Sequence, residues 1–219
     1  MNVITLDSKH WAKAEKNGAK RDIIAETIQT AANAAMDILP NVPPHVNIVV
    51  APVGASEVIP ETGDAGVTYS DEYVSIVFDY AMPYELERLR ESLHSMVYHE
   101  LVHAVTFSHD PWQSGMLFGA ITEGLATVFE RDYSNGQVPL WSKYEDDETM
   151  KAWWTELKEL PETGEKNNEY FVNHSDGRKW IVYKTGTWIV DRMVASGTDL
   201  FAMMEMNHKD IVAQFEAGQ

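Results

Sequence analysis

The sequence predicts an α+β fold, with a small mixed sheet and one long buried helix followed by a mainly helical C-terminal half. Three observations support this prediction. Short runs rich in β-branched and aromatic residues occur between residues 46 and 78, which is typical of strands. The stretch from 95 to 108 carries no charge other than Glu100, although 23% of the chain is charged. Beyond residue 129, apolar residues recur mostly at helical spacing.

Each expected element follows from this spacing and from the turn residues beside it. Apolar residues recur at helical intervals from 20 to 38, and Pro40 ends that helix. A long helix is expected over 84–107, with Pro83 at its start. Strands are expected at 46–51, 67–69 and 73–78. Later helices are expected at 119–130, 146–160, 180–195 and 198–206, with a polar connector over 161–175.

The length and composition allow one domain built from two lobes. A chain of 219 residues with 44% hydrophobic residues can bury a substantial core. We expect an N-terminal α/β lobe over 1–108 that ends in the long helix, and a mainly helical C-terminal lobe over 109–219, with a cleft between them. The chain has no cysteine, which excludes disulfides and thiolate metal sites.

The charge and hydropathy patterns limit the classes of binding partner and the cellular locations that we expect. A net charge of −17 argues against nucleic acids and anionic membrane surfaces, because both require basic patches. No apolar run approaches the roughly 18 residues of a membrane span. Residues 1–20 contain no apolar core of a signal peptide. We therefore expect a cytoplasmic protein, or a secreted one if a leader has been removed, and the oligomeric state stays open.

Residues 99–103, His-Glu-Leu-Val-His, form the most informative motif. Positions i and i+4 share one face of a helix, so His99 and His103 can direct two imidazoles at one ion. Glu100 lies beside them and can reach a water on that ion. Two histidines and one further carboxylate leave zinc a position for water, which is a catalytic arrangement. The alternative is a core helix whose polar groups are satisfied by neighbours, at a considerable cost of burial.

Two residues compete for the third ligand position. His109 follows His103 by six residues, as in metzincins, but Thr106 stands where that pattern needs a helix-breaking glycine. A helix that continues through Thr106 turns His109 away from the metal-binding face. Glu123 lies in a thin helix whose glycines allow a close approach to the first helix. We therefore favour Glu123, with Glu130, two turns further on the same face, as a weaker substitute.

With nineteen residues between His103 and Glu123, the segment 99–130 resembles the gluzincin peptidases, the thermolysin-like group. Two local segments are similar to those of small bacterial zinc proteases: His-Glu-Leu-Val-His-Ala-Val-Thr and Gly-Ala-Ile-Thr-Glu-Gly-Leu-Ala. The resemblance covers about a third of the chain, roughly residues 66–130. It implies a zincin-like fold and an edge strand that pairs with an extended peptide. The segment 73–78 is either that edge strand or an ordinary internal strand. Thr127 stands where the family has an Asp that supports a zinc-bound histidine, so another group must take that role.

This resemblance implies a zinc-dependent peptidase with one Zn²⁺ per chain and a peptide or protein substrate. Glu100 is then the general base that takes a proton from the attacking water. Gluzincins supply an oxyanion donor from the helical lobe, and the candidates here are Tyr183 and, less favoured, His174. The alternatives are a metzincin-like hydrolase that uses His109, a catalytically silent zinc-binding domain, and a peptide-binding module without metal.

Overall fold

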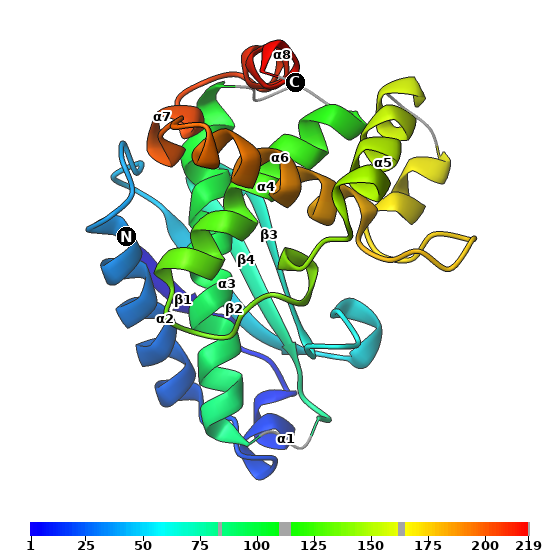
Figure 1. The fold of residues 1–219 in the computed structure, drawn as a ribbon. Helices are drawn as coiled ribbons and strands as arrows, with labels where there is room; N and C mark the ends of the chain where they lie inside the picture. The colour runs from blue at the N-terminus through cyan, green and yellow to red at the C-terminus, as the bar shows by residue number, and fades with distance from the viewer. Residues whose placement is uncertain (83–84, 110–114, 162–164, 219) are drawn as a thin grey trace. The chain divides into compact units, whose positions relative to one another are not determined.

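The computed structural model describes residues 1–82, 85–109, 115–161 and 165–218. These residues form two compact units. The first unit comprises residues 1–107 and 130–137, and the second comprises residues 108–129 and 138–219. Figure 1 shows the order of the elements along the chain. Within the described residues, no helix is both long enough and apolar enough to span a membrane.

The first unit contains a four-stranded mixed sheet, in which three of the strands were predicted. Its strands are β1 (Asn2–Thr5), β2 (Asn47–Val53), β3 (Asp64–Ser70) and β4 (Tyr73–Asp79), in the order β1-β2-β4-β3. The pairs β1–β2 and β2–β4 are parallel, whereas β3 and β4 are antiparallel. Of the two possibilities for 73–78, an edge strand or an ordinary internal strand, the structure shows the internal strand. β3 is the edge strand beside it.

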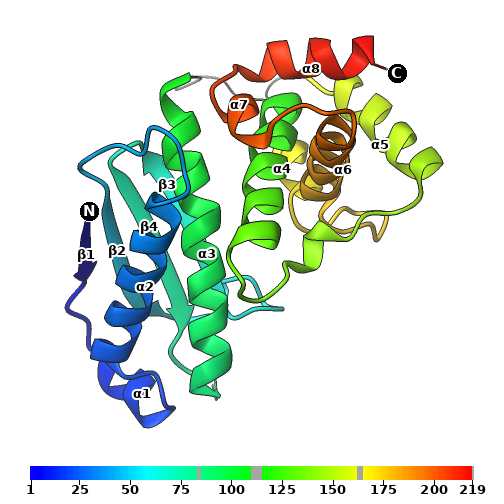
Figure 2. The same ribbon diagram turned by 60° about the vertical axis from the view of Figure 1, so that its left-hand side comes forward.

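Two helices, α2 (Arg21–Met36) and α3 (Leu86–Thr106), cover one face of this sheet, as Figure 2 shows. Alternate strand residues point toward them, because successive side chains of a strand face opposite sides. The inward residues of the central strands are fully buried: Ile48, Val50, Val74, Ile76 and Phe78. A short helix, α1 (Trp11–Lys16), adds Trp11, whose ring lies 5.7 Å from that of Phe78.

The second unit is helical, as predicted. It holds most of α4 (Met116–Tyr133), whose last turn belongs to the first unit, and it also holds α5 (Asp147–Glu159) and α6 (Ile181–Ala195). Two short helices follow, α7 (Leu200–Met204) and α8 (His208–Ala217). Asp147 accepts hydrogen bonds from the Trp188 indole and from Arg192, which joins the start of α5 to α6. Phe215 of α8 packs edge-on against both Trp154 and Trp188.

Most predicted helices agree with the structure to within a few residues. The sequence prediction missed β1 and α1, which are too short to show a clear period, and it also missed α8. The polar connector contains a 3-10 helix over Glu165–Tyr170. Pro83 and Tyr84, at the expected start of the long helix, and residues 162–164 of the connector lie outside the described residues.

Candidate metal centre

The middle of α3 brings three potential metal ligands together. His99, Glu100 and His103 each offer one ligand atom, and these atoms lie within 4.8 Å of one another. His99 and Glu100 are buried and His103 is half-buried. The two imidazole rings are 4.9 Å apart between centroids. One helical turn separates the histidines, so the backbone of α3 by itself creates this arrangement.

His99 has a carboxylate partner on its other side. Its Nδ1 lies 3.0 Å from Oε2 of Glu130, and both side chains are less than one-tenth exposed. Burial raises the pKa of Glu130 to about 7, although the hydrogen bond with His99 opposes this shift. A neutral His99 that donates its Nδ1–H to Glu130 has an unprotonated Nε2, whose lone pair is of the kind that binds a metal. Glu130 therefore supplies the support that Thr127 cannot.

The segment that carries Glu130 is fixed to α3 at a second point. The hydroxyl oxygens of Ser95 and Ser134 lie 3.3 Å apart in the buried interior. Gly136 follows, and a Cβ at that position would overlap Ser95 Oγ. The close approach of 130–137 to α3 therefore depends on small residues, and it holds the Glu130 carboxylate beside His99.

Glu100 faces the edge strand. The Thr68 hydroxyl of β3 lies 2.7 Å from Glu100 Oε2 and 2.9 Å from the main-chain oxygen of the same residue. Gly66, two residues earlier on β3, lies against the same side chain. Glu100 is thus held by β3, whereas His99 is held by Glu130.

These contacts fit a zinc ion. Two imidazoles and a carboxylate are donors that zinc accepts, and the contact between His99 Nδ1 and Glu130 can remain when His99 binds the ion through Nε2. A core helix without metal would instead bury the polar side chains of His99 and Glu100, with His103 half-buried beside them, in one place. The donor set and the His99–Glu130 pair thus favour a metal centre over a purely structural cluster.

The remaining predicted residues lie in the second unit. Glu123 is on α4 and Tyr183 is on α6. Tyr183 is half-buried among the rings of Trp141, Trp180 and Phe171, at centroid distances of 5.4, 5.8 and 6.3 Å. His174 is held in its loop, with Nδ1 2.8 Å from Asp176 Oδ1.

The structure gives a different reason for the glycines of α4. A Cβ on Gly124 would overlap the backbone of Gly186 in α6, and a Cβ on Gly186 would overlap the carbonyl of Ala120. Gly124 therefore serves the crossing of α4 and α6. That the glycines of α4 also allow a close approach to the zinc-motif helix stays a prediction.

The rival ligand His109 lies just beyond α3. The helix continues through Thr106, as the absence of a glycine predicted, and a 3-10 turn over Phe107–His109 follows. Thr106 adds a hydrogen bond from its hydroxyl to the carbonyl of Val102. Its β-branched side chain is thus accommodated inside the helix.

A model of one protein family matches residues 24–213, which is most of the chain and includes the motif and most of each unit. The family is described as predicted Zn-dependent proteases, DUF2268. The chain belongs to this family. No curated protein and no solved structure matches the chain significantly. Within this DUF2268 chain, the buried His99-Glu100-His103 cluster is compatible with the zinc dependence in the family's description.

The role of Glu130 was not predicted from the sequence. It was considered only as a substitute for Glu123 in the metal shell, whereas its carboxylate contacts the imidazole of His99. The one available signal was that Thr127 left His99 without the expected partner. Many carboxylates follow residue 99, so the sequence could not select among them.

Proposed function

We propose that the protein is a zinc-dependent peptidase of the gluzincin type, with His99, His103 and Glu123 as ligands of one Zn²⁺ per chain. The observation that carries the proposal is the buried pairing of His99 with Glu130, beside Glu100 and His103. A zinc-binding imidazole commonly donates its other N–H to a carboxylate. A zinc site with a further glutamate next to its histidines has a use for that glutamate in proton transfer.

The choice of Glu123 rests on helix geometry and on sequence spacing. Glu123 and Glu130 are seven positions apart within α4, and seven positions are almost two full turns, so the two carboxylates share one face of the helix. Glu130 on that face contacts His99. A ligand role for Glu123 would also give the ion a negatively charged protein ligand, in addition to two neutral imidazoles.

The residues of this chain would then divide the chemistry among them. When bound, zinc lowers the pKa of a coordinated water toward neutrality and polarises the substrate carbonyl. Glu100 accepts the proton of the attacking water and delivers it to the leaving amine. Glu130 holds His99 in one tautomer and orientation. Tyr183 would donate a hydrogen bond from its hydroxyl to the carbonyl oxygen as negative charge develops there.

We propose that the substrate is an extended peptide that pairs with β3. The Asp79 N–H donates to the Gly63 carbonyl at 2.8 Å, and antiparallel strands alternate between residues that bond to the partner and residues that do not. The main-chain groups of Gly66 and Thr68, an odd number of positions further on, therefore point away from β4. An edge strand of this kind can add a further strand.

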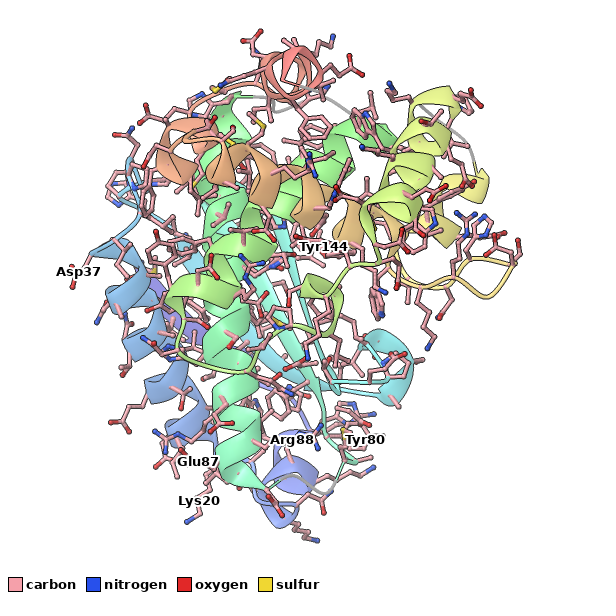
Figure 3. The ribbon with its side chains drawn as sticks, in the orientation of Figure 1. Lys20, Asp37, Tyr80, Glu87, Arg88 and Tyr144 are labelled. Carbon is pink, nitrogen blue, oxygen red and sulfur yellow. The ribbon has the colours of Figure 1, made fainter. Side chains whose placement is uncertain are left out.

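Hydrolysis of a peptide mixture by the purified protein tests this function. We expect activity that a chelator abolishes and stoichiometric zinc restores. Glu100→Gln should retain zinc and lose about 10²-fold or more in kcat, because general base catalysis typically contributes that much. Glu87→Gln is the matched control, since Glu87 is an exposed glutamate of the same helix (Figure 3). Zinc binding without hydrolysis would instead indicate a catalytically silent domain, and protein that stays metal-free in excess zinc would contradict the zinc site itself.

A further inference from the structure

The carboxylate of Glu100 is surrounded by two residues of the edge strand β3, Gly66 and Thr68. Thr68 pairs with Val74 of β4 and Gly66 pairs with Ile76. Val74 and Ile76 are fully buried beneath the helices. Because paired residues in a sheet face the same side, Gly66 and Thr68 also face the helices. The sheet thus directs both of them at α3.

The Thr68 hydroxyl bridges two acceptors of one residue. It lies 2.7 Å from the carboxylate oxygen Oε2 of Glu100 and 2.9 Å from the main-chain oxygen of Glu100. A donor within reach of both atoms fixes the side chain relative to its own backbone, and so restricts the rotamers of Glu100. Ordering a flexible glutamate side chain costs conformational entropy. Because the contact with Thr68 lies within the protein itself, that cost is met before any substrate binds.

Gly66 provides the room that this rotamer occupies. A Cβ at position 66 would lie 2.6 Å from Cγ and 2.7 Å from Cδ of Glu100, and closer still to Oε1. All three of the nearest atoms belong to Glu100. Glycine is unfavourable inside a strand because it packs nothing there. The close approach of the Glu100 head group accounts for its presence in β3.

We propose that Thr68 and Gly66 are positioning residues for Glu100. Thr68 holds Oε2 by a hydrogen bond, and Gly66 leaves space for the rest of the carboxylate, so that the base keeps one orientation beside the two histidines. This proposal rests on the proposed function for its effect on hydrolysis. The contact between β3 and Glu100 does not depend on the proposed function and can be tested without zinc.

The contact is tested by a double-mutant cycle on the metal-free protein in chelator. Gly66→Ala should lower Tm by a few degrees in the wild-type background, because the new methyl group displaces the Glu100 side chain. In the Glu100→Ala background the obstructing atoms are gone, and the same substitution should leave Tm unchanged or raise it. An equal loss of Tm in both backgrounds would overturn the assigned role of Gly66.

The effect on catalysis is tested with Thr68→Val and Thr68→Ser. Valine keeps the shape of threonine and removes the hydroxyl, so kcat should fall roughly tenfold or more while KM and zinc affinity stay close to wild type. Serine retains the hydroxyl and should recover most of kcat. Ser75→Ala, which removes a hydroxyl from the opposite face of β4, is the control and should change none of these quantities.

The outcomes distinguish the positioning role in hydrolysis from the packing contact between β3 and Glu100. Wild-type kcat in Thr68→Val, equal losses in the valine and serine variants, or loss of zinc in Thr68→Val would each overturn the positioning role of Thr68. A wild-type protein that binds zinc and hydrolyses no peptide would overturn the proposed function and the catalytic part of this proposal. The thermal cycle on the metal-free protein would still decide whether Gly66 makes room for Glu100.

Discussion

Glu130 and His99 form a buried pair, with Oε2 of the carboxylate 3.0 Å from Nδ1 of the imidazole. The two residues are 31 positions apart and come from α4 and α3. In the proposed site, the pair gives the two nitrogens of His99 different roles, because Nδ1 contacts Glu130 and Nε2 is the nitrogen that would bind the metal. If the proposed gluzincin-type site is correct, Glu130 takes the supporting role that Thr127 cannot fill.

Removing this pair should weaken zinc binding without removing a ligand. We expect Glu130→Ala to reduce zinc affinity about 10–100-fold, as is typical for the loss of a partner that orients a metal-binding histidine. Competition with a chelating indicator measures the affinity directly. Asp132→Asn, which changes a more exposed carboxylate of the same helix, should leave it unchanged. Wild-type affinity in Glu130→Ala would show that the pair has no part in holding the metal.

The third ligand can be identified by two single substitutions. Glu123→Ala should weaken zinc binding severely, because two histidines alone hold the ion poorly and it loses its charged protein ligand. His109→Ala should leave the affinity almost unchanged, since α3 continues through Thr106 before the turn that carries His109. Titration of both variants against a chelator gives the comparison. The opposite result would replace the gluzincin assignment with a metzincin-like one.

Tyr183 has two separable properties, its packing and its hydroxyl. Tyr183→Phe keeps the aromatic ring and its contacts with the neighbouring rings. Because the packing is retained, Tm should stay close to that of the wild type. If the hydroxyl stabilises the developing oxyanion, kcat should fall about 10²–10³-fold. Steady-state kinetics together with a thermal melt distinguish the two roles. Unchanged kcat would leave Tyr183 as a packing residue of the second unit.

Asp64 makes the stability of the first unit depend on pH. Burial raises the pKa of this carboxyl above its ordinary 3.8, and hydrogen bonds from Ser92 and Thr62 offset only part of the shift. Well below pH 3.8 the carboxyl of Asp64 is protonated in both the folded and the unfolded state, so it does not lower the free energy of unfolding. As pH rises from there toward the folded-state pKa, the unfolded state releases its proton more readily, so this group lowers stability.

Asp64→Asn should therefore raise Tm at neutral pH, by about 2–4 °C for each kcal/mol relieved in a chain of this size. The gain should shrink as the pH falls toward 3.5, where the wild-type carboxyl is also neutral. Thermal melts across this range measure it. Asp37→Asn is the control, because Asp37 is an exposed carboxylate at the end of α2 (Figure 3). A gain in Tm that does not change with pH would contradict the assigned cause.

The sequence by itself determined the elements that repeat a pattern over several turns and the residues that one helix brings together. The helix over 84–107, found as α3, and the helical second half follow from apolar spacing. His99, Glu100 and His103 are placed by the period of a single helix, so no tertiary contact is needed to bring them within 4.8 Å. Short elements such as β1, with only four residues, carry too little pattern to be recognised.

Only the tertiary structure decided which residues surround those three side chains. Glu130 lies beside His99, and Thr68 with Gly66 lies against Glu100, because α4 and β3 are brought to α3 by packing between distant segments. The same is true of the order of strands, which places β4 inside the sheet and β3 at its edge. Hydrogen bonding and burial between remote segments depend on how layers pack. Local periodicity contains no information about which distant segments pack together, so the partners of the motif can be identified only in the folded chain.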